Sequence, residues 1–367
     1  MKKKFFLLIM VMGMALFMAA CGSSNNNADN NDGGNSGGSD GNGDTDYKVG
    51  LVTDVGGVDD KSFNQSAWEG LQSWGEEHGL EKGEGFDYAQ SKSDSDYTPN
   101  LQTLVRGDYD LVYGIGFKLE KAMEDIADQY PDKEFGIVDA VVEADNIVSI
   151  TFADNESSFL AGVAAAEKTN TDKVGFIGGE ESGIIEAFEV GFRAGVKSVD
   201  EDIDVNVQYA GSFEAADEGK LIASSMYNED RDVIMHASGA TGNGLFAQAI
   251  DLKKSDPDRD VWAIGVDRDQ YDEGQAGDDN ITLTSAVKRV DNAVEQVNDM
   301  AMDGDFPGGE VLEFDLEDEG VGYTTSNEDA MTDDIVDAVE DWKEKIIAGD
   351  VDVPNTYDEL EDYLDSL

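Results

Sequence analysis

Residues 49–70 read VGLVTDVGGVDDKSFNQSAWEG and predict an apolar strand, a loop of glycines and acids, and a helix, in that order. The strand covers 49–53 and the loop covers 54–60. The helix begins near Ser62, after which apolar side chains recur at helical spacing, at Phe63, Ala67, Leu71 and Trp74. In open α/β sheets, ligands bind outside the carboxyl ends of the strands, on loops that lead into helices. We therefore expect an α/β fold in which residues 54–60 form a candidate ligand-binding loop.

The chain is long and extremely acidic. Its 367 residues suffice for two domains, and 81 Asp and Glu against 25 Lys and Arg give a formal net charge of -56. Self-repulsion of this size would destabilise a compact fold in dilute buffer, but about 1 M salt shortens the screening length to roughly 3 Å. The acids are spread over nearly every predicted helix and loop. This spread favours adaptation to a high-salt habitat over a cation store or a nucleic-acid mimic, and the scarcity of cations argues against binding to DNA or RNA phosphates.

The first 46 residues predict an export signal followed by a tether. Three lysines at 2–4 precede an uncharged run over 5–20, which is the order of a secretory signal peptide. The residues MAACG at 18–22 resemble a lipoprotein signal box, so we expect residues 1–21 to be a lipoprotein signal and Cys21 to carry the lipid. The alternative is a buried cysteine at the end of an uncleaved anchor helix. Residues 22–46 consist mainly of Gly, Asn, Ser and Asp, which cannot form a core, and they are expected to be a disordered linker.

Cys21 is the only cysteine in the chain. A disulfide within one chain and a cysteine-based zinc site are therefore both excluded.

Beyond residue 47, predicted strands and helices alternate in two rounds. The first round has strands at 111–115, 134–138 and 146–151, and the second at 173–177, 205–209, 232–235 and 261–266. This alternation predicts two doubly wound, parallel lobes. Later strands at 282–287 and 311–314 suggest that the chain returns to the first lobe before it finishes on the second. We expect residues 47–151 and 267–309 to form lobe 1, and 152–266 and 310–367 to form lobe 2, joined by a multi-stranded hinge that lets the lobes close over a ligand.

Motifs of the common enzyme classes are missing. The sequence has no G-x-S-x-G elbow, no H-E-x-x-H pair and no phosphate-binding G-x-x-x-x-G-K, and the glycines at 114–116 and 239–244 do not form a dinucleotide fingerprint. Of the two histidines, His78 is predicted to be a solvated helix residue. His236 ends a strand and enters a glycine loop, where a histidine packs or binds more often than it catalyses. We expect no catalysis, no cofactor and no metal.

Three acids directly follow apolar strands: they are Asp54, Asp139 and Asp267. Carboxylates at these positions face the crevice between lobes, where their oxygens can accept hydrogen bonds from vicinal hydroxyls. Lys288 lies in an apolar setting where an unpaired ammonium would be costly, so it is expected either to bind the ligand or to pair with an acid. Phe63 fits a core position or a stacking position equally well; stacking contributes about 1–3 kcal/mol per base in nucleic-acid systems.

The stretch 56–70, GGVDDKSFNQSAWEG, closely resembles the signature of the basic-membrane-protein (BMP) family, substrate-binding lipoproteins whose best-known members bind purine nucleosides for ABC importers. Further similar segments follow in the expected order, at 135–139, 152–162, 174–179, 209–213, 239–246, 265–267 and 284–290. The resemblance extends from residue 47 to the middle of the three-hundreds. It implies the type I periplasmic-binding-protein fold.

The resemblance also implies roles for single residues. Phe63 would stack on the base, and Asn64 and Asp139 would read its edges. Asp54, Asp267 and Lys288 would hold the base or the ribose, with the last two favoured for the ribose.

A second aromatic commonly closes the base sandwich from the other lobe of BMP proteins. Here the corresponding region contains Met235 and His236, either of which is expected to replace that aromatic, with Gly239 in the same loop.

The leading hypothesis is therefore a monomeric receptor anchored to the outer face of the cell membrane, which clamps a nucleoside and delivers it to an ABC permease and its ATPase. Two alternatives stay open at this point. One is a sensor lipoprotein that uses the same clamp to signal to a membrane partner. The other is an enzyme acting on nucleosides, against which the missing nucleophile and base weigh.

Overall fold

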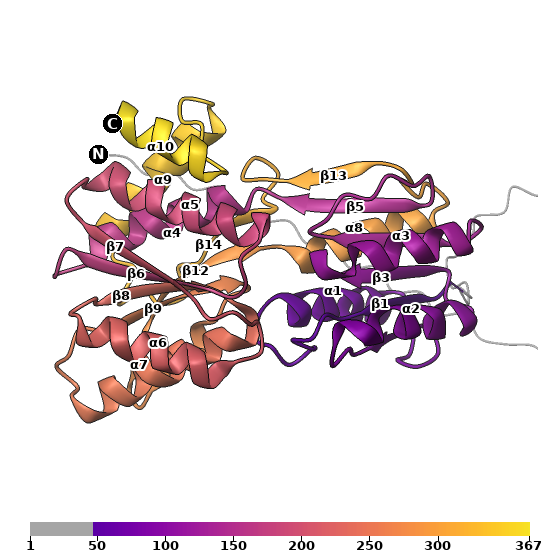
Figure 1. Ribbon diagram of the computed structural model, residues 1–367, viewed down its shortest axis with the longest axis horizontal. Coiled ribbons are helices and arrows are strands. Elements are labelled where there is room, and N and C mark those ends of the chain that lie inside the picture. The colour runs from indigo at the N-terminus through magenta and orange to yellow at the C-terminus, as the bar shows by residue number, and fades with distance from the viewer. Residues whose placement is uncertain (1–46) are drawn as a thin grey trace, which may run out of the picture. The chain divides into compact units, whose positions relative to one another are not determined.

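The computed structural model describes residues 47–367, which form two six-stranded, mainly parallel sheets covered by helices (Figure 1). The predicted signal, the lipid-attachment site Cys21 and the linker lie outside the described residues. Within residues 47–367, no helix combines the length and the apolar composition needed to cross a membrane.

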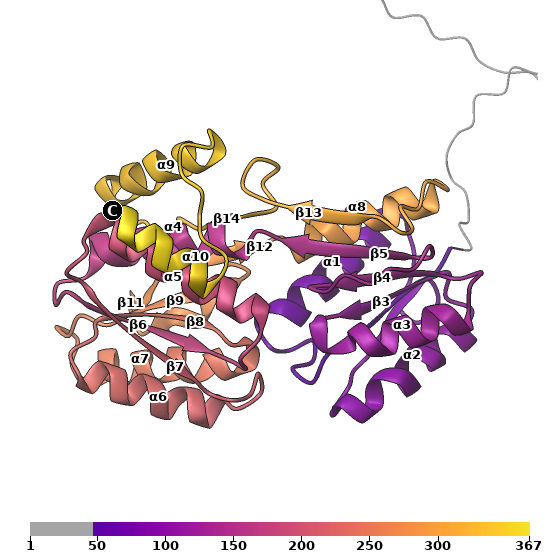
Figure 2. The same cartoon turned by 45° about the horizontal axis from the view of Figure 1, so that its top comes forward.

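The first sheet has the order β13-β5-β4-β3-β1-β2, and all its neighbours are parallel. Its strands are β1 (Val49–Val52), β2 (Phe86–Ala89), β3 (Leu111–Ile115), β4 (Glu134–Val138), β5 (Ile147–Phe152) and β13 (Val311–Phe314). Helices α1 (Phe63–Glu77) and α8 (Val290–Met302) cover one face, and α2 (Tyr97–Arg106) and α3 (Glu120–Gln129) cover the other (Figure 2). Successive strand residues serve opposite faces: Leu51 packs in the core under α1, and Val52 packs in the core under α2 and α3.

The second sheet has the order β14-β12-β9-β8-β6-β7, with only β14 antiparallel to its neighbour. Its strands are β6 (Lys173–Gly178), β7 (Asp204–Tyr209), β8 (Val233–Ala237), β9 (Trp262–Asp267), β12 (Thr282–Lys288) and β14 (Val321–Tyr323). Helices α4 (Asp154–Lys168) and α5 (Gly183–Val199) cover one face, with α9 (Asp333–Ile347) and α10 (Tyr357–Ser366) packed outside them, and α6 (Ala216–Asn228) and α7 (Asn243–Ser255) cover the other (Figure 1). The two-residue strands β10 (Gln275–Ala276) and β11 (Asp279–Asn280) form a small separate hairpin.

The chain passes between the two sheets three times: from β5 into α4, from β12 into α8, and from β13 into β14. The predicted lobe boundaries differ from this path. Residues 282–288 were expected in lobe 1 but pair with β9 in the second sheet, and residues 311–314 were expected in lobe 2 but pair with β5 in the first. A short apolar run fits either sheet equally well, so the composition of these strands could not decide between the sheets.

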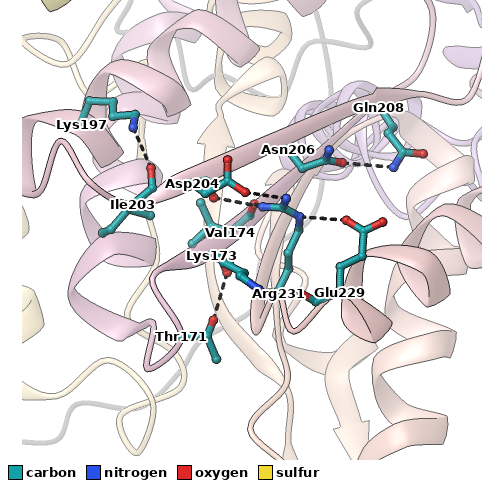
Figure 3. Close-up of polar contacts among 10 residues, drawn as sticks. All are labelled: Thr171, Lys173, Val174, Lys197, Ile203, Asp204, Asn206, Gln208, Glu229 and Arg231. Carbon is teal, nitrogen blue, oxygen red and sulfur yellow. Dashed lines mark hydrogen bonds and ion pairs between the residues drawn. The ribbon is translucent and has the colours of Figure 1, made fainter.

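A buried arginine joins the starts of three strands in the second sheet (Figure 3). The guanidinium of Arg231 donates to the carbonyl oxygens of Val174 and Asp204, at 2.9 and 3.0 Å, and to the Asp204 carboxylate at 2.7 Å. Glu229 lies 3.6 Å from its Nε. These contacts fix the ends of β6, β7 and β8 that lie opposite the carboxyl ends where ligands bind in such sheets.

Candidate functional site

A cavity lies between the carboxyl ends of the two sheets, with about 540 Å³ of atom-free space that is partly open to solvent. From the first lobe it is lined by the loops after β1, β3 and β4 and by the start of α1. From the second lobe it is lined by α5, by the loops after β7 and β8, and by the ends of β8, β9 and β12. All six primary site residues from the sequence line it: Asp54, Phe63, Asn64, Asp139, Asp267 and Lys288. Gly239, also predicted, is among the lining residues.

The loop after β1 is held by its own side chains. The Nδ2 group of Asn64 donates to Asp54 Oδ1 at 2.7 Å and to Asp60 Oδ2 at 2.9 Å, while Asn64 Oδ1 accepts from the Asp54 backbone N–H at 3.2 Å. Asp60 is buried and accepts backbone hydrogen bonds from Ser62, Asn64 and Gln65, so it caps the start of α1. Burial raises the pKa of Asp60.

Asp54 offers one oxygen to the cavity. Its Oδ1 is occupied by Asn64 and by the Gly56 N–H at 2.8 Å, whereas its Oδ2 accepts no hydrogen bond from residues 47–367. A Cβ added at Gly116 would lie 3.6 Å from this Oδ2 and 3.4 Å from the Phe63 ring, and the φ of +108° at Gly116 also requires glycine. Glycine at position 116 therefore leaves the space beside the free oxygen open. Burial raises the pKa of Asp54 to about 6.

Lys288 lies at the centre of a buried ion cluster. Its Nζ is 2.6 Å from an oxygen of Asp139 and 3.1 Å from Asp154, the first residue of α4. The rings of Phe63, Phe152 and Phe188 surround the ammonium at 5.1 to 5.7 Å. The sequence left open whether Lys288 meets the ligand or an acid; in the structure it is paired and also lines the cavity.

The charges of this cluster do not balance. Burial disfavours the ammonium of Lys288, but three surrounding carboxylates outweigh this effect and raise its pKa. Burial raises the pKa of Asp154 to about 8, and the negative neighbours Asp139 and Asp267 add to this rise against the opposing pull of Lys288. One ammonium thus faces more carboxylates than it can neutralise, so the cluster retains a proton more readily than an exposed acid would.

Asp267 connects the two lobes. Its Oδ2 accepts a hydrogen bond from the hydroxyl of Ser62, and burial raises its pKa to about 7. Asp139 directly follows β4 and Asp267 is the last residue of β9, the equivalent strand of the second lobe, and both have left-handed backbones, with φ of +66° and +68°. Non-glycine residues adopt this conformation rarely, and it is common at functional sites.

Met235 and His236 do not line the cavity, so the expectation that one of them closes the aromatic sandwich is not met. Strand β8 extends to Ala237, and both side chains are fully buried within the second lobe. The aromatic rings that reach the cavity from this lobe are Phe188 of α5 and Phe213 of the loop after β7.

Sequence reasoning missed several residues at the cavity mouth and behind its wall. Lys118, in the turn after β3, forms an ion pair of 2.5 Å with Glu180 of the second lobe. Phe117 and Phe213 meet edge to face above the cavity with ring centroids 6.2 Å apart. Asp154 lies within the quoted segment 152–162, but only the position of α4 against β12 shows that it reaches Lys288.

The geometry agrees with the comparisons to known proteins. The family described as "Bmp: ABC transporter substrate-binding protein PnrA-like" matches residues 47–357. The chain belongs to this family. It is 50% identical over 363 residues to "CD4+ T-cell-stimulating antigen" of Listeria monocytogenes, covering 96% of this chain and 99% of the relative. It is 47% identical over 318 residues to "ABC transporter nucleoside-binding protein BmpA" of Lactococcus lactis, covering 85% of this chain and 90% of the relative.

Among solved structures, an ABC transporter solute-binding protein from Aeropyrum pernix superposes with a TM-score of 0.76 at 24% identity, covering 87% of this chain and 98% of that chain. The type I periplasmic-binding-protein fold expected from the resemblance is therefore confirmed. This Bmp-family chain is a substrate-binding protein of the ABC transporter class and not an enzyme.

Proposed function

We propose that this Bmp-family protein binds a purine nucleoside in the cavity between its lobes and delivers it to an ABC permease and its ATPase. The observation that carries the proposal is the combination of aromatic rings and hydrogen-bond acceptors in one cavity: Phe63 lines it beside the free oxygen of Asp54, and Phe188 and Phe213 line it from the other lobe. A nucleoside offers a flat ring and hydroxyl and N–H donors, which match these two kinds of group. The printed name of the Lactococcus lactis relative supports the choice of ligand.

The hydrogen bonds refine the roles expected of single residues. Asn64 donates both amide hydrogens to Asp54 and Asp60, so we infer that it positions Asp54, whose Oδ2 then accepts from an N–H on the base edge. Asp267 has one oxygen bound to Ser62 and the other available for a ribose hydroxyl. Lys288 is held by Asp139 and donates toward the ribose from the hinge side.

The site has the means to close. Three polar contacts join the two lobes. The Ser62 hydroxyl donates to Asp267, Lys118 forms an ion pair with Glu180, and Gln270 Nε2 donates to the carbonyl oxygen of Lys61 at 2.8 Å. A ligand that contacts both lobes stabilises this closed arrangement by its higher affinity for it. We further propose that Cys21 carries a lipid, that residues 22–46 tether the body to the outer face of the membrane, and that the receptor acts as a monomer. Membership of a family of ABC transporter substrate-binding proteins favours import over the sensing alternative.

Isothermal calorimetry in molar salt tests the proposal with a panel of purine and pyrimidine nucleosides, nucleobases, ribose and nucleoside 5′-monophosphates. We expect purine nucleosides to bind and monophosphates to bind at least 100-fold more weakly, because Lys288 is the only basic side chain among the described lining residues and is already paired. Asp267→Asn should weaken nucleoside binding about tenfold or more, while the exposed matched variant Asp278→Asn should leave it unchanged. Absence of binding by every nucleoside would refute the proposal, and unchanged binding by Asp267→Asn would refute the ribose assignment.

A further inference from the structure

A row of buried polar side chains lies behind the second-lobe wall of the cavity. It runs from Gln270, in the loop after β9, through His236 at the end of β8 to Ser238, which lines the cavity. His236 Nε2 lies 2.9 Å from Gln270 Oε1, and His236 Nδ1 lies 3.2 Å from Ser238 Oγ. All three side chains are at most 1% exposed, so each hydrogen-bonding atom must find its partner within the protein or in the cavity.

The backbone fixes the orientation of the Gln270 amide. The N–H of Val266 points at one end of this amide at 3.0 Å, and the carbonyl oxygen of Lys61 lies 2.8 Å from the other end. A backbone N–H can only donate and a carbonyl can only accept. The end facing Val266 is therefore the amide oxygen, and the end facing Lys61 is the NH₂ group.

The orientation of Gln270 in turn fixes the proton on His236. Because Gln270 Oε1 can only accept, His236 Nε2 must carry the proton that it shares with it. Burial lowers the pKa of His236 to about 4, so the ring is neutral at ordinary pH and carries one proton. Its Nδ1 is then a bare acceptor, and the hydroxyl of Ser238 must donate to it.

Packing keeps the His236 ring in this position. A Cβ added at Gly242 would lie 2.1 Å from the imidazole ring of His236, so only glycine fits there. The ring of Phe246 packs edge to face against the same imidazole, with an interplanar angle of 86° and centroids 5.9 Å apart. Ser238 makes no capping bond with the turn that follows it, and among residues 47–367 the only side-chain partner of its Oγ is His236. The one proton of Ser238 is thus committed to His236, and its lone pairs are unused.

We propose that Ser238 is a specificity-determining residue, held by His236 and Gln270 so that its hydroxyl accepts a hydrogen bond from a donor on the ligand and offers none. The inference rests on the proposed nucleoside ligand for its functional meaning. It predicts preference for the member of a nucleoside pair that carries an additional N–H or O–H at the position facing Ser238. A ligand with an acceptor at that position would meet a lone pair and be disfavoured.

The first test reads the proton on His236 without any ligand. Long-range ¹H–¹⁵N correlation spectra of the ¹⁵N-labelled protein in molar salt would resolve its two histidines, and loss of one set of signals in His78→Gln would assign them. We expect His236 to carry its proton on Nε2 throughout pH 6 to 8. A proton on Nδ1 would overturn the proposal, because Ser238 would then be free to donate into the cavity.

The second test reads specificity. Affinities would be measured for pairs that differ by one donor: adenosine and purine riboside, guanosine and inosine, and inosine and its 2′-deoxy and 3′-deoxy forms. In the unmodified protein we expect the donor-bearing member of at least one pair to bind about tenfold more tightly than the other member. Ser238→Ala should reduce this affinity ratio to less than threefold and leave the ratios of the other pairs unchanged. The exposed α6 variant Ser225→Ala should keep every ratio, and His236→Phe should reduce the same ratio as Ser238→Ala.

The two tests separate this inference from the proposed function. Unchanged ratios in Ser238→Ala would overturn the role of Ser238 while leaving nucleoside binding intact. If no nucleoside binds the unmodified protein, the proposed ligand fails, and the proton on His236 still decides whether Ser238 can only accept.

Discussion

Replacing Lys288 by methionine should destabilise the protein strongly, and more at neutral than at acidic pH. Methionine keeps much of the apolar stem but removes the ammonium that lies 2.6 Å from Asp139 and 3.1 Å from Asp154. Because all three side chains are at least nine-tenths buried, the carboxylates would be left without their counter-ion in a poorly solvated place. Breaking a buried ion pair by removing one partner costs about 3–5 kcal/mol, so we expect a loss of about 4 kcal/mol at pH 7.

The pH dependence follows from the protons that the folded variant retains. Lys288 opposes the rise in the pKa of Asp154 and of Asp267, so without it both pKa values in the folded state rise further above the unfolded value of about 3.9. A raised folded pKa gives stability that is complete below the unfolded pKa and is lost as the pH rises. Between pH 5 and 7 we expect the folded variant to hold one more proton than the folded unmodified protein. The difference in free energy of unfolding between the two proteins then shrinks by about 1.4 kcal/mol for each pH unit by which the pH falls. The expected deficit at pH 5 is therefore about 1 kcal/mol.

Urea unfolding in molar salt at pH 5, 6 and 7 measures both quantities. Lys121→Met is the matched control, because Lys121 is exposed on α3 and its pairs with Glu124 and Asp125 lie at the surface; its effect should stay within about 0.5 kcal/mol at every pH. A deficit below about 1 kcal/mol at pH 7 would show that the cluster does not depend on the ammonium. If the loss in free energy of unfolding is as large at pH 5 as at pH 7, lost packing and not uncompensated charge causes it.

Three further variants test other parts of the structure. Arg231→Met removes the donors to two strand carbonyls and should lower the free energy of unfolding by about 2 kcal/mol in urea titrations; a change under about 0.5 kcal/mol would contradict the bracing role given to it. Gly242→Ala places a methyl group 2.1 Å from an imidazole ring and should cost about 1–3 kcal/mol, whereas Gly183→Ala, with open space around it, should be neutral or stabilising. Glu180→Gln breaks the 2.5 Å ion pair at the cavity mouth and should speed ligand release about two- to fivefold in stopped-flow displacement. The neighbouring exposed variant Glu181→Gln should leave the release rate unchanged, and equal rates in both variants would argue against an ion-pair latch.

The sequence predicts most of the strands near the site because they are continuous apolar runs with charged or glycine boundaries. The predictions for β3 and β4 match the structure in full, and that for β1 within one residue. Strand β2, with the sequence FDYA, is short and half polar, and helix α2 begins with polar residues, so neither was predicted. Their place beside β1 becomes visible only once the sheet is formed.

Site residues were predictable where a local pattern determines them. An acid that directly follows a buried parallel strand faces the end of the sheet, and this rule placed Asp54, Asp139 and Asp267 in the cavity. It could not identify Asp154, because the first residue of a helix reaches Lys288 only through the packing of α4 against β12.

The resemblance was wrong about which residue of this region closes the base sandwich, because neither Met235 nor His236 reaches the cavity. The sequence predicts that the strand ends before His236, whereas β8 continues to Ala237 and keeps the imidazole inside the lobe. The prediction therefore located the right loop and was confirmed for Gly239, but it named Met235 and His236 where Ser238 lines the cavity.

Salt screens the charges on the surface more than the charges in the cavity, and the less screened charges of the cavity favour an uncharged ligand. Molar salt would screen the excess of surface acids, but it screens carboxylates that are buried between the lobes much less. Inside, Asp54 and Asp267 each keep an oxygen that the described residues leave without a hydrogen bond, while the ammonium of Lys288 is paired with Asp139 and Asp154. An anion would add repulsion that no remaining cation offsets, and an apolar molecule would leave the acceptors unsatisfied at a cost of about 1–3 kcal/mol each. A neutral molecule with a flat ring and several hydroxyl or N–H donors satisfies both conditions, so we expect the site to favour the proposed nucleoside over its phosphates at any salt concentration in which the fold is stable.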